Sequence, residues 1–209
     1  QEFMGLEFYV NEHVLIPRQD TETLVELVLS EHKEKNISLL DVCTGSGCIA
    51  ISLAKLGGYT DVTALDLSEE ALKVARSNGE KLLDQPVKFI KSDMFSALNP
   101  EKQYNVIVSN PPYIPSQVIE GLEPEVKDHE PRMALDGEPD GLKFYRILAE
   151  EGKKYLKNGG SIYMEIGWDQ AKDVTEIFEA MGFSGRRTVR DMAGNDRVVC
   201  AGRRSEDYV

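Results

Sequence analysis

Short apolar runs alternate along the chain with longer segments whose apolar positions recur every three or four residues. The short runs, rich in Val, Ile and Leu, predict buried strands, and the longer segments predict helices with one apolar face. The predicted strands are residues 37–42, 62–66, 87–90, 106–108 and 161–166, and the predicted helices are residues 48–56, 68–83, 141–156 and 168–181. Strands that alternate with helices predict an α/β fold with a mainly parallel sheet.

Both ends of the chain depart from this alternation. Residues 7–10 and 13–16 predict a small hairpin, after which Asp20 or Thr21 is a candidate helix cap. At the other end, residues 185–191 and 197–201 flank a turn and predict an antiparallel edge of the sheet. A chain of 209 residues suits one well-buried domain. We therefore expect a hairpin and linker over residues 1–20 and the α/β domain over residues 21–209.

The overall charge narrows the choice of partners. The 36 acidic and 24 basic residues give a net charge of −12, and this disfavours a nucleic acid as the direct substrate because binding phosphates needs a basic face. Three cysteines give neither a disulfide framework nor the spacing of a metal site. No apolar run approaches the roughly 18 residues of a membrane span. We expect a cytoplasmic protein with no metal and no membrane partner.

The tetrapeptide Asn110-Pro111-Pro112-Tyr113 directly follows the predicted strand at 106–108. Open α/β sheets bind their ligands beyond the carboxyl ends of the strands, which places Asn110 at the rim of a crevice. A side-chain amide held there offers one acceptor and two donors to a flat, nitrogen-bearing group of a substrate. This favours a transferase that acts on an amide or an exocyclic amine. The alternative is a Pro-Pro turn that is closed by a packed tyrosine.

A glycine-rich loop joins the first strand of the alternating pattern to its helix. It consists of Cys43, Thr44, Gly45, Ser46 and Gly47. Glycines allow a backbone to turn sharply and to approach a ligand closely, and the helix start adds free N–H groups. The loop also fits the dinucleotide-binding pattern, so that by itself it is a weak signal.

Acidic residues end the next two strands. Asp66 lies 21 residues after Gly45, where a carboxylate can accept both hydroxyls of a ribose, although an Asp here can equally be a helix cap. Asp93 can accept a hydrogen bond from an adenine amino group, with Met94 or Phe95 against the ring face, although an Asp at a strand end is also common without such a role. The glycine loop and the two acids suit an adenosine-bearing cofactor, and both NAD and S-adenosylmethionine fit.

A long segment, residues 111–139, contains many Pro and Glu residues and no clear helix or strand pattern. Loops of this length inside a compact domain are usually lids or binding loops. Because the segment begins at Asn110–Tyr113, we expect it to take part in function. Trp168 and Tyr163, by contrast, are expected in the core.

The chain resembles the HemK/PrmC family, the protein-(glutamine-N5) methyltransferases that modify the Gly-Gly-Gln glutamine of peptide-chain release factors. The resemblance extends from about residue 5 to residue 203. It rests on Leu15-Ile16-Pro17-Arg18 with Asp20-Thr21-Glu22, on Asp41 to Gly47, on Asn110 to Tyr113, on Glu130-Pro131-Arg132 with Ala134-Leu135, on Asp140-Gly141-Leu142, on Glu165-Ile166-Gly167 and on Asp191. The stretches at 17–22 and 130–142 are the most specific to this family.

The resemblance implies a Rossmann-like class I S-adenosylmethionine-dependent methyltransferase, whose catalytic domain is residues 21–209. It implies that S-adenosyl-L-methionine is bound by the glycine loop, Asp66 and Met94, with Asp93 and Asn110 beside it. It also implies that Asn110, Pro111, Pro112 and Tyr113 hold the substrate glutamine of a release factor, and that Asn110, Pro111 and Tyr113 carry the catalysis.

Two departures from the family pattern concern the loop and the N-terminus. Cys43 stands where the family usually has Gly, and the helical domain that family members carry before the hairpin has no counterpart in this sequence. Glu130 and Arg132 are further candidates for positioning the substrate, with an ordinary surface ion pair as the alternative, and Arg18 is a candidate for packing on the cofactor side or for contacting the substrate. Two other functions remain open from the residues: amino methylation of adenine N6 or guanine N2 in a nucleic acid, and a nicotinamide-dependent oxidation, which leaves Asn110–Tyr113 unexplained.

Overall fold

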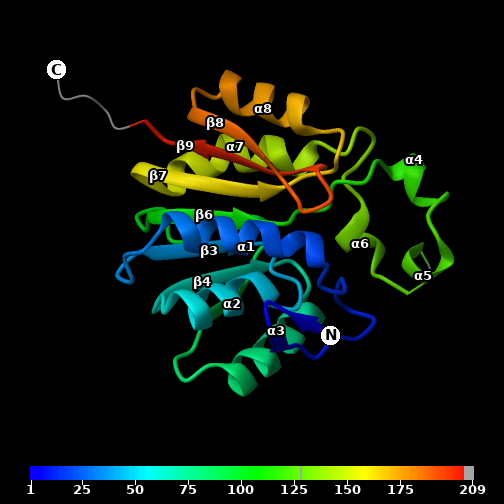
Figure 1. Cartoon of the computed structure of the whole chain (residues 1–209), viewed down its shortest axis with the longest axis horizontal. Coiled ribbons are helices and arrows are strands. Elements are labelled where there is room, and N and C mark those ends of the chain that lie inside the picture. Colours follow the sequence, from blue (N-terminus) through cyan, green and yellow to red (C-terminus); the bar gives the residue numbers. More distant parts are fainter. Residues whose placement is uncertain (128, 205–209) are drawn as a thin grey trace.

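A seven-stranded sheet forms the centre of the molecule (Figure 1). The computed structural model describes residues 1–127 and 129–204. The strand order is β5-β4-β3-β6-β7-β9-β8, with β5 to β7 parallel and β9 antiparallel to both of its neighbours. The strands are β3 (Ser38–Val42), β4 (Asp61–Asp66), β5 (Lys88–Lys91), β6 (Tyr104–Ser109), β7 (Leu156–Glu165), β8 (Ser184–Arg190) and β9 (Asp196–Gly202). The predicted α/β class and the antiparallel C-terminal edge are confirmed.

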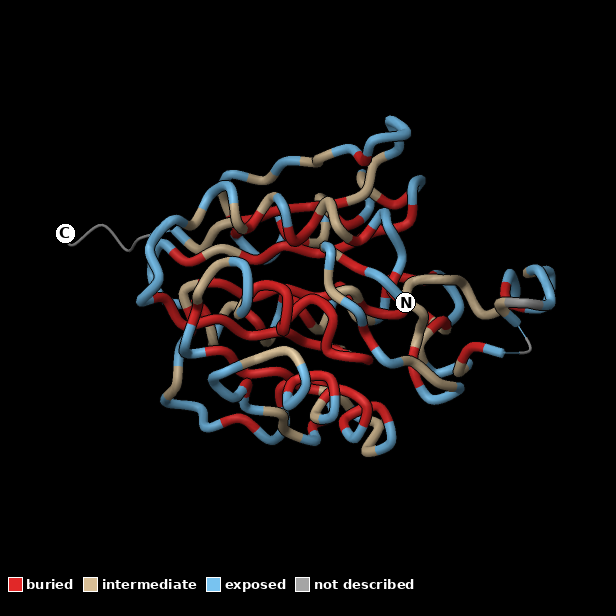
Figure 2. Tube along the Cα trace, turned by 60° about the horizontal axis from the view of Figure 1, so that its bottom comes forward, coloured by how far each residue is buried: buried red, intermediate tan, exposed pale blue. Residues whose placement is uncertain are grey.

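Helices cover both faces of the sheet because successive strand residues point to opposite sides. Leu39 belongs to a core cluster with α1 and α2, whereas the next residue, Leu40, belongs to a second cluster with α7 and α8. The helices are α1 (Gln19–Glu31), α2 (Cys48–Gly57), α3 (Glu69–Leu82), α7 (Lys143–Tyr155) and α8 (Ala171–Ala180), and α3 contacts α2 and the strands β4 and β5. Buried residues accordingly follow the strands and the inner sides of these helices (Figure 2).

The N-terminal hairpin is shorter and lies earlier than predicted. Strand β1 (Glu2–Phe3) pairs with β2 (Leu6–Glu7) around a turn, and residues 8–18 contain no strand, so the predicted pairing of 7–10 with 13–16 is wrong. The buried Phe3 and Phe8 pack edge to face and pin the hairpin to the core. Helix α1 begins at Gln19 without a side-chain cap, because its N-cap residue is Arg18. Neither Asp20 nor Thr21 is the cap. The division of the chain after residue 20 stays a prediction, and residues 205–209 lie outside the described part.

Residues 111–127 and 129–139 form a lobe whose first and last segments meet at its base (Figure 1). Ile114 and Asp136 form an isolated parallel bridge, and the Ile114 N–H donates to the carbonyl of Leu135. Three short helices lie in this segment, so the prediction of an irregular loop is wrong; they are α4 (Ser116–Ile119), α5 (Pro124–Lys127) and α6 (Arg132–Leu135). At the base, Gly141 permits a close approach, since a Cβ there would lie 2.4 Å from the carbonyl oxygen of Tyr113.

Two aromatic residues expected in the core differ in their placement. Tyr163 is buried, and its hydroxyl donates to Glu31, as expected for a core tyrosine that has a polar partner. Trp168 is 69% exposed because α8 begins only at Ala171, three residues later, and leaves the tryptophan on the loop after β7. Its predicted core position is wrong. Among the helices of the described residues, none is both long and apolar enough to cross a membrane.

Candidate functional site

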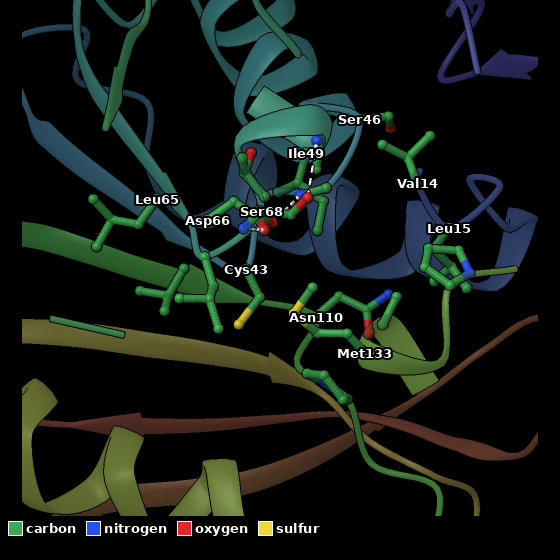
Figure 3. A pocket seen from close by; sticks show the side chains of 18 of the residues that line it. Val14, Leu15, Cys43, Ser46, Ile49, Leu65, Asp66, Ser68, Asn110 and Met133 are labelled. Atoms are coloured by element: carbon green, nitrogen blue, oxygen red, sulfur yellow. Dashed lines mark hydrogen bonds between the residues drawn. The ribbon is translucent and has the colours of Figure 1, made fainter. Parts of the chain in front are cut away.

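A pocket of about 260 Å³ lies at the carboxyl ends of the neighbouring strands β5, β4, β3 and β6 (Figure 3). This is the edge at which open α/β sheets bind ligands, and the volume is near the lower end for small-molecule sites. The pocket collects most of the site residues that the sequence predicts: Cys43, Thr44, Gly45, Ser46, Asp66, Asp93, Met94, Asn110 and Pro112. The other three, Gly47, Pro111 and Tyr113, lie next to lining residues in the chain but do not line the pocket themselves.

The glycine loop turns by left-handed backbone conformations at Cys43, Gly45 and Gly47, whose φ angles are 65°, 54° and 82°. Gly47 is also required by packing, because a Cβ there would lie 2.9 Å from Ile51 and 3.1 Å from Ala75. Cys43 adopts the conformation that a glycine would adopt more readily, which costs about 1 kcal/mol. The loop therefore keeps a glycine-like shape at residue 43. Burial raises the pKa of the Cys43 thiol, so the side chain stays neutral.

Asp66 holds the glycine loop against the start of α3. Its Oδ2 accepts the N–H of Gly45 at 2.8 Å, and its Oδ1 accepts the N–H of Ser68 at 2.9 Å. Burial raises the pKa of the carboxyl, and these backbone hydrogen bonds act in the opposite direction. Each carboxylate oxygen keeps a lone pair that is open to the pocket. The N-cap of α3 is Ser68, which accepts from Ala71, so Asp66 is not itself the helix cap.

Asp41 lies directly below this loop and has no contact with solvent. The Thr44 hydroxyl donates to its Oδ2 at 2.6 Å and ties the loop to strand β3. Burial raises the pKa of Asp41 to about 7. The predicted site did not include Asp41, although an aspartate inside an apolar strand was a sign in the sequence that could have indicated it.

Asp93 and Met94 follow the end of strand β5 and belong to the same pocket. Asp93 is exposed at the pocket, whereas Met94 is buried and its sulfur lies 3.9 Å from the sulfur of Cys43. A carboxylate beside an apolar, polarisable side chain offers an acceptor for an amino group and a surface for a flat ring. The predicted roles of both residues toward an adenine stay predictions.

Asn110 enters the same pocket from the end of β6. In Figure 3 it lies on the side of Met133, across from Asp66 and Ser68. Its Nδ2 donates to the Thr21 hydroxyl oxygen at 3.4 Å. The amide therefore faces the cavity that the glycine loop lines and is not turned into the protein interior. Thr21, which the sequence suggested as a helix cap and as part of the family-specific stretch 17–22 but not as a site residue, also lines the pocket.

Tyr113 points away from this pocket. Its hydroxyl donates to Oε1 of the buried Glu165 at 3.1 Å, and its carbonyl oxygen accepts from Gln170. Burial raises the pKa of the Tyr113 phenol, which stays a neutral donor. Contact between the Tyr113 ring and a substrate amide stays a prediction.

An ion pair joins the two segments that close the pocket on its outer side. Arg18 ends the segment 13–18, Glu130 precedes the segment 131–134, and both segments contribute lining residues. Arg18 Nη2 lies 2.6 Å from Glu130 Oε1, and the Glu130 side chain is only 2% exposed. The sequence suggested both residues as positioning candidates but did not predict that they pair. Arg132, the third candidate, pairs instead with Glu120 at the surface.

Comparison with known proteins finds relatives of this chain. The family model "Methyltransferase small domain" matches residues 19–121. A release factor glutamine methyltransferase from Clostridium acetobutylicum is 45% identical over 203 residues, which are 96% of this chain and 71% of that protein. The one from Fusobacterium nucleatum is 44% identical over 205 residues, which are 96% of this chain and 57% of the relative.

A solved structure is also similar. It is the release factor-specific protein-(glutamine-N5) methyltransferase from Alicyclobacillus acidocaldarius, which is 32% identical with a TM-score of 0.55 over 94% of this chain and 99% of that chain. This chain thus spans little more than half of the Fusobacterium relative and nearly all of the solved one. The resemblance found in the motifs is confirmed, and the chain belongs to the family of release factor glutamine methyltransferases, within the class I methyltransferase fold.

Proposed function

We propose that this chain binds S-adenosyl-L-methionine in the pocket and methylates N5 of the glutamine in the Gly-Gly-Gln motif of peptide-chain release factors. The observation that carries the proposal is the presence of the Asn110 amide in the cavity that the glycine loop, Asp66 and Asp93 also line. One cavity therefore holds both a candidate donor site and a polar group suited to an amide. The expected release factor partner places the protein in the cytoplasm.

The residues of the pocket fit this cofactor. Asp66 and Asp93 supply carboxylates for ribose hydroxyls and an amino group, and they favour a ligand that carries a positive charge. Leu65 and Met94 supply apolar surface for a flat ring. S-adenosylmethionine, when bound, supplies an electrophilic methyl group on a cationic sulfur.

The substrate amide needs help because its nitrogen lone pair is delocalised into the carbonyl group. The Asn110 side-chain oxygen and the Pro111 carbonyl oxygen would accept the two N–H bonds of the glutamine amide. Positive charge that develops on the nitrogen strengthens both hydrogen bonds in the transition state, and this difference lowers the barrier. Holding the nitrogen about 3–3.5 Å from the methyl carbon completes the geometry. The methylated nitrogen is acidic enough to lose its proton to water.

Methylation of a nucleic acid base is the competing activity. A base must be flipped out of its stack or presented single-stranded, and its phosphates need a basic surface. The net charge of −12 disfavours this alternative. The competing substrates are DNA, for adenine N6, and ribosomal RNA, for guanine N2.

The test is transfer of a labelled methyl group to a purified release factor, to the same factor with its motif glutamine replaced, to DNA and to ribosomal RNA. Asn110→Ala should lower turnover about 10²–10³-fold, because it removes one preorganised polar group, and should change cofactor affinity much less. Calorimetry with S-adenosylmethionine supplies that control. Near-normal turnover of Asn110→Ala, or label on nucleic acid rather than on the glutamine, would overturn the proposal.

A further inference from the structure

We propose that Thr21, held in turn by Glu165, fixes the orientation of the Asn110 amide so that its oxygen, rather than its nitrogen, faces the substrate. Thr21 is then a positioning residue for the transfer reaction, because it acts through Asn110. This inference rests on the proposed function, since it concerns the group that would bind the substrate amide.

The two residues meet although 89 positions separate them in the sequence. Asn110 Nδ2 and Thr21 Oγ1 are 3.4 Å apart, where α1 begins beside the end of β6. Thr21 is 2% exposed, and both residues line the pocket. Among the described residues, no donor forms a hydrogen bond with the other amide atom, Asn110 Oδ1. That oxygen is available to a ligand.

Glu165, at the end of β7, is the buried carboxyl that interacts with Thr21. Its carboxyl is buried, and Oε1 already accepts the Tyr113 hydroxyl. Its Oε2 is also buried and, within the part of the chain that the structure describes, has no hydrogen-bond partner. The Thr21 hydroxyl is a donor that can turn toward this carboxyl, and its interaction with Glu165 lowers the pKa of the carboxyl.

The orientation of the amide follows from counting protons. A threonine hydroxyl has one proton to donate, and an ionised carboxylate can only accept. If Thr21 donates to Glu165, it presents only lone pairs to Asn110, and an amide NH₂ can satisfy them whereas an amide oxygen cannot. Nδ2 then faces Thr21, and Oδ1 faces the cavity. An oxygen so placed is the acceptor that an N–H bond of the substrate needs.

Burial is the largest influence on Glu165 and raises its pKa, while nearby groups oppose this rise and favour the ionised form that the count requires. The Arg197 guanidinium is almost buried and lowers the pKa of Glu165, as do the interactions with Thr21 and Tyr113. Burial and the negative charge of Asp20 act in the opposite direction and raise the pKa. Arg197 also pairs with Asp191 at 3.1 Å and with Asp20 at 3.2 Å, which fixes its position.

The experiment measures kcat and KM with a release factor and S-adenosylmethionine for Thr21→Val and Thr21→Ser. Thr21→Val keeps the shape and removes the hydrogen bonds, so kcat should fall about tenfold, the effect of one neutral hydrogen bond. Both KM values should change less than about twofold. Thr21→Ser should recover most of the lost turnover. The matched control is Thr175→Val on α8, whose hydroxyl donates to its own helix at Ala171 and lies outside the pocket lining.

A double-variant cycle tests whether Glu165 acts through Thr21. Glu165→Gln should also lower kcat, because a glutamine side chain can donate to Thr21 and free the threonine proton to turn toward Asn110. Since Glu165 acts through Thr21, the Thr21→Val/Glu165→Gln double variant should be no slower than Thr21→Val alone. Losses that multiply would overturn the proposal. So would full turnover of Thr21→Val, or equal losses in Thr21→Val and Thr21→Ser.

Three further outcomes separate the possible failures. If Thr21→Val does not bind the cofactor, Glu165→Gln decides alone, since unchanged kcat in that variant contradicts the proposed orientation. If Asn110→Ala itself keeps normal turnover, the proposed function fails. If Asn110→Ala is slow but neither Thr21→Val nor Glu165→Gln is, only the orienting role fails.

Discussion

The pocket has two walls that are built in different ways. The inner wall consists of the strand ends, namely residues 43–46, Asp66, Asp93 with Met94, and Asn110. The outer wall consists of the segments 13–18 and 131–134. The inner wall is continuous with the parallel ladder of β5 to β6, whereas the outer wall contains no strand and only the short helix α6. Its Met133 is 52% exposed, which shows how little protein lies behind it.

This difference separates rigid from adjustable parts of the site. Backbone hydrogen bonds of a sheet hold the inner wall in place, so that a loop with several left-handed residues keeps its shape. The outer wall depends on side chains, above all on the Arg18–Glu130 pair. Segments with few buried apolar contacts open locally at low cost. We therefore expect substitutions in the inner wall to have larger effects than those in the outer wall.

The largest effect is expected at Asp41, beneath the inner wall, and it depends on pH. Its pKa is raised from 3.8 in the unfolded chain to about 7 in the folded one, so the folded state binds more protons between these values. The contribution of Asp41 to the free energy of unfolding should therefore be largest at and below about pH 4. It should fall by about 4 kcal/mol between about pH 4 and pH 7.

Asp41→Asn removes this titration and keeps an oxygen for the Thr44 hydroxyl. Urea unfolding of both proteins from pH 5 to pH 8 gives the measurement, in which the stability of the variant relative to the parent should rise with pH. Because both proteins contain the other titrating groups, the contributions of those groups cancel in the difference between the two curves. Parallel curves would mean that Asp41 does not titrate in this range.

The next effect concerns the cofactor contacts of the inner wall. Asp66→Ala should weaken S-adenosylmethionine binding about 10–100-fold, because hydrogen bonds to a charged group contribute about 1.5–3 kcal/mol. Titration calorimetry measures the dissociation constant. Asp61→Ala is the matched control, because Asp61 begins the same strand at its opposite end and pairs there with Lys102. An unchanged constant in Asp66→Ala would remove its ribose-binding role.

The inner wall is also the wall that the sequence predicts. Each of its residues follows a short apolar run, and parallel strands bring their carboxyl ends to one edge. Local sequence thus suffices to place Asp66, Asp93 and Asn110 together. The residues of the outer wall carry no such signal, since 112 positions separate Arg18 from Glu130. Their pairing depends on how the lobe folds back, and only the family-specific stretches hinted that they matter.

The same reasoning explains the errors. The hairpin predicted over residues 7–16 failed because those apolar residues pack individually: Val14 lies against Ala71 and Val74 of α3. Alternating apolar residues next to a larger core need no strand partner. Residues 116–135 contain helices of only four residues each, too short to show helical periodicity. Thr21 and Glu165 stood in the family motifs but were given no role in the site, because a buried polar residue on an apolar helix or strand gains its role from a distant neighbour.

The smallest effect is expected at the ion pair that supports the outer wall. Two glutamates of the neighbouring lobe form ion pairs with arginines. Glu130 is buried beside Arg18, whereas Glu120 is exposed beside Arg132. Burial raises the pKa of Glu130, and Arg18 lowers it again. Glu130→Ala should reduce the free energy of unfolding by about 1–2 kcal/mol. This is less than for a fully buried pair, because the Arg18 side chain is 44% exposed and partly screened by water.

Glu120→Ala is the matched change, since it removes the same charge from an exposed pair and should leave the unfolding midpoint unchanged. Amide hydrogen exchange gives the sharper measurement, because it reports opening residue by residue. In Glu130→Ala, exchange should accelerate in segments 13–18 and 131–135 while the strand residues of β3 and β6 keep their protection. Faster exchange throughout the sheet would show that the two walls unfold as one unit. Equal effects of the two substitutions would show that burial of Glu130 does not hold the outer wall together.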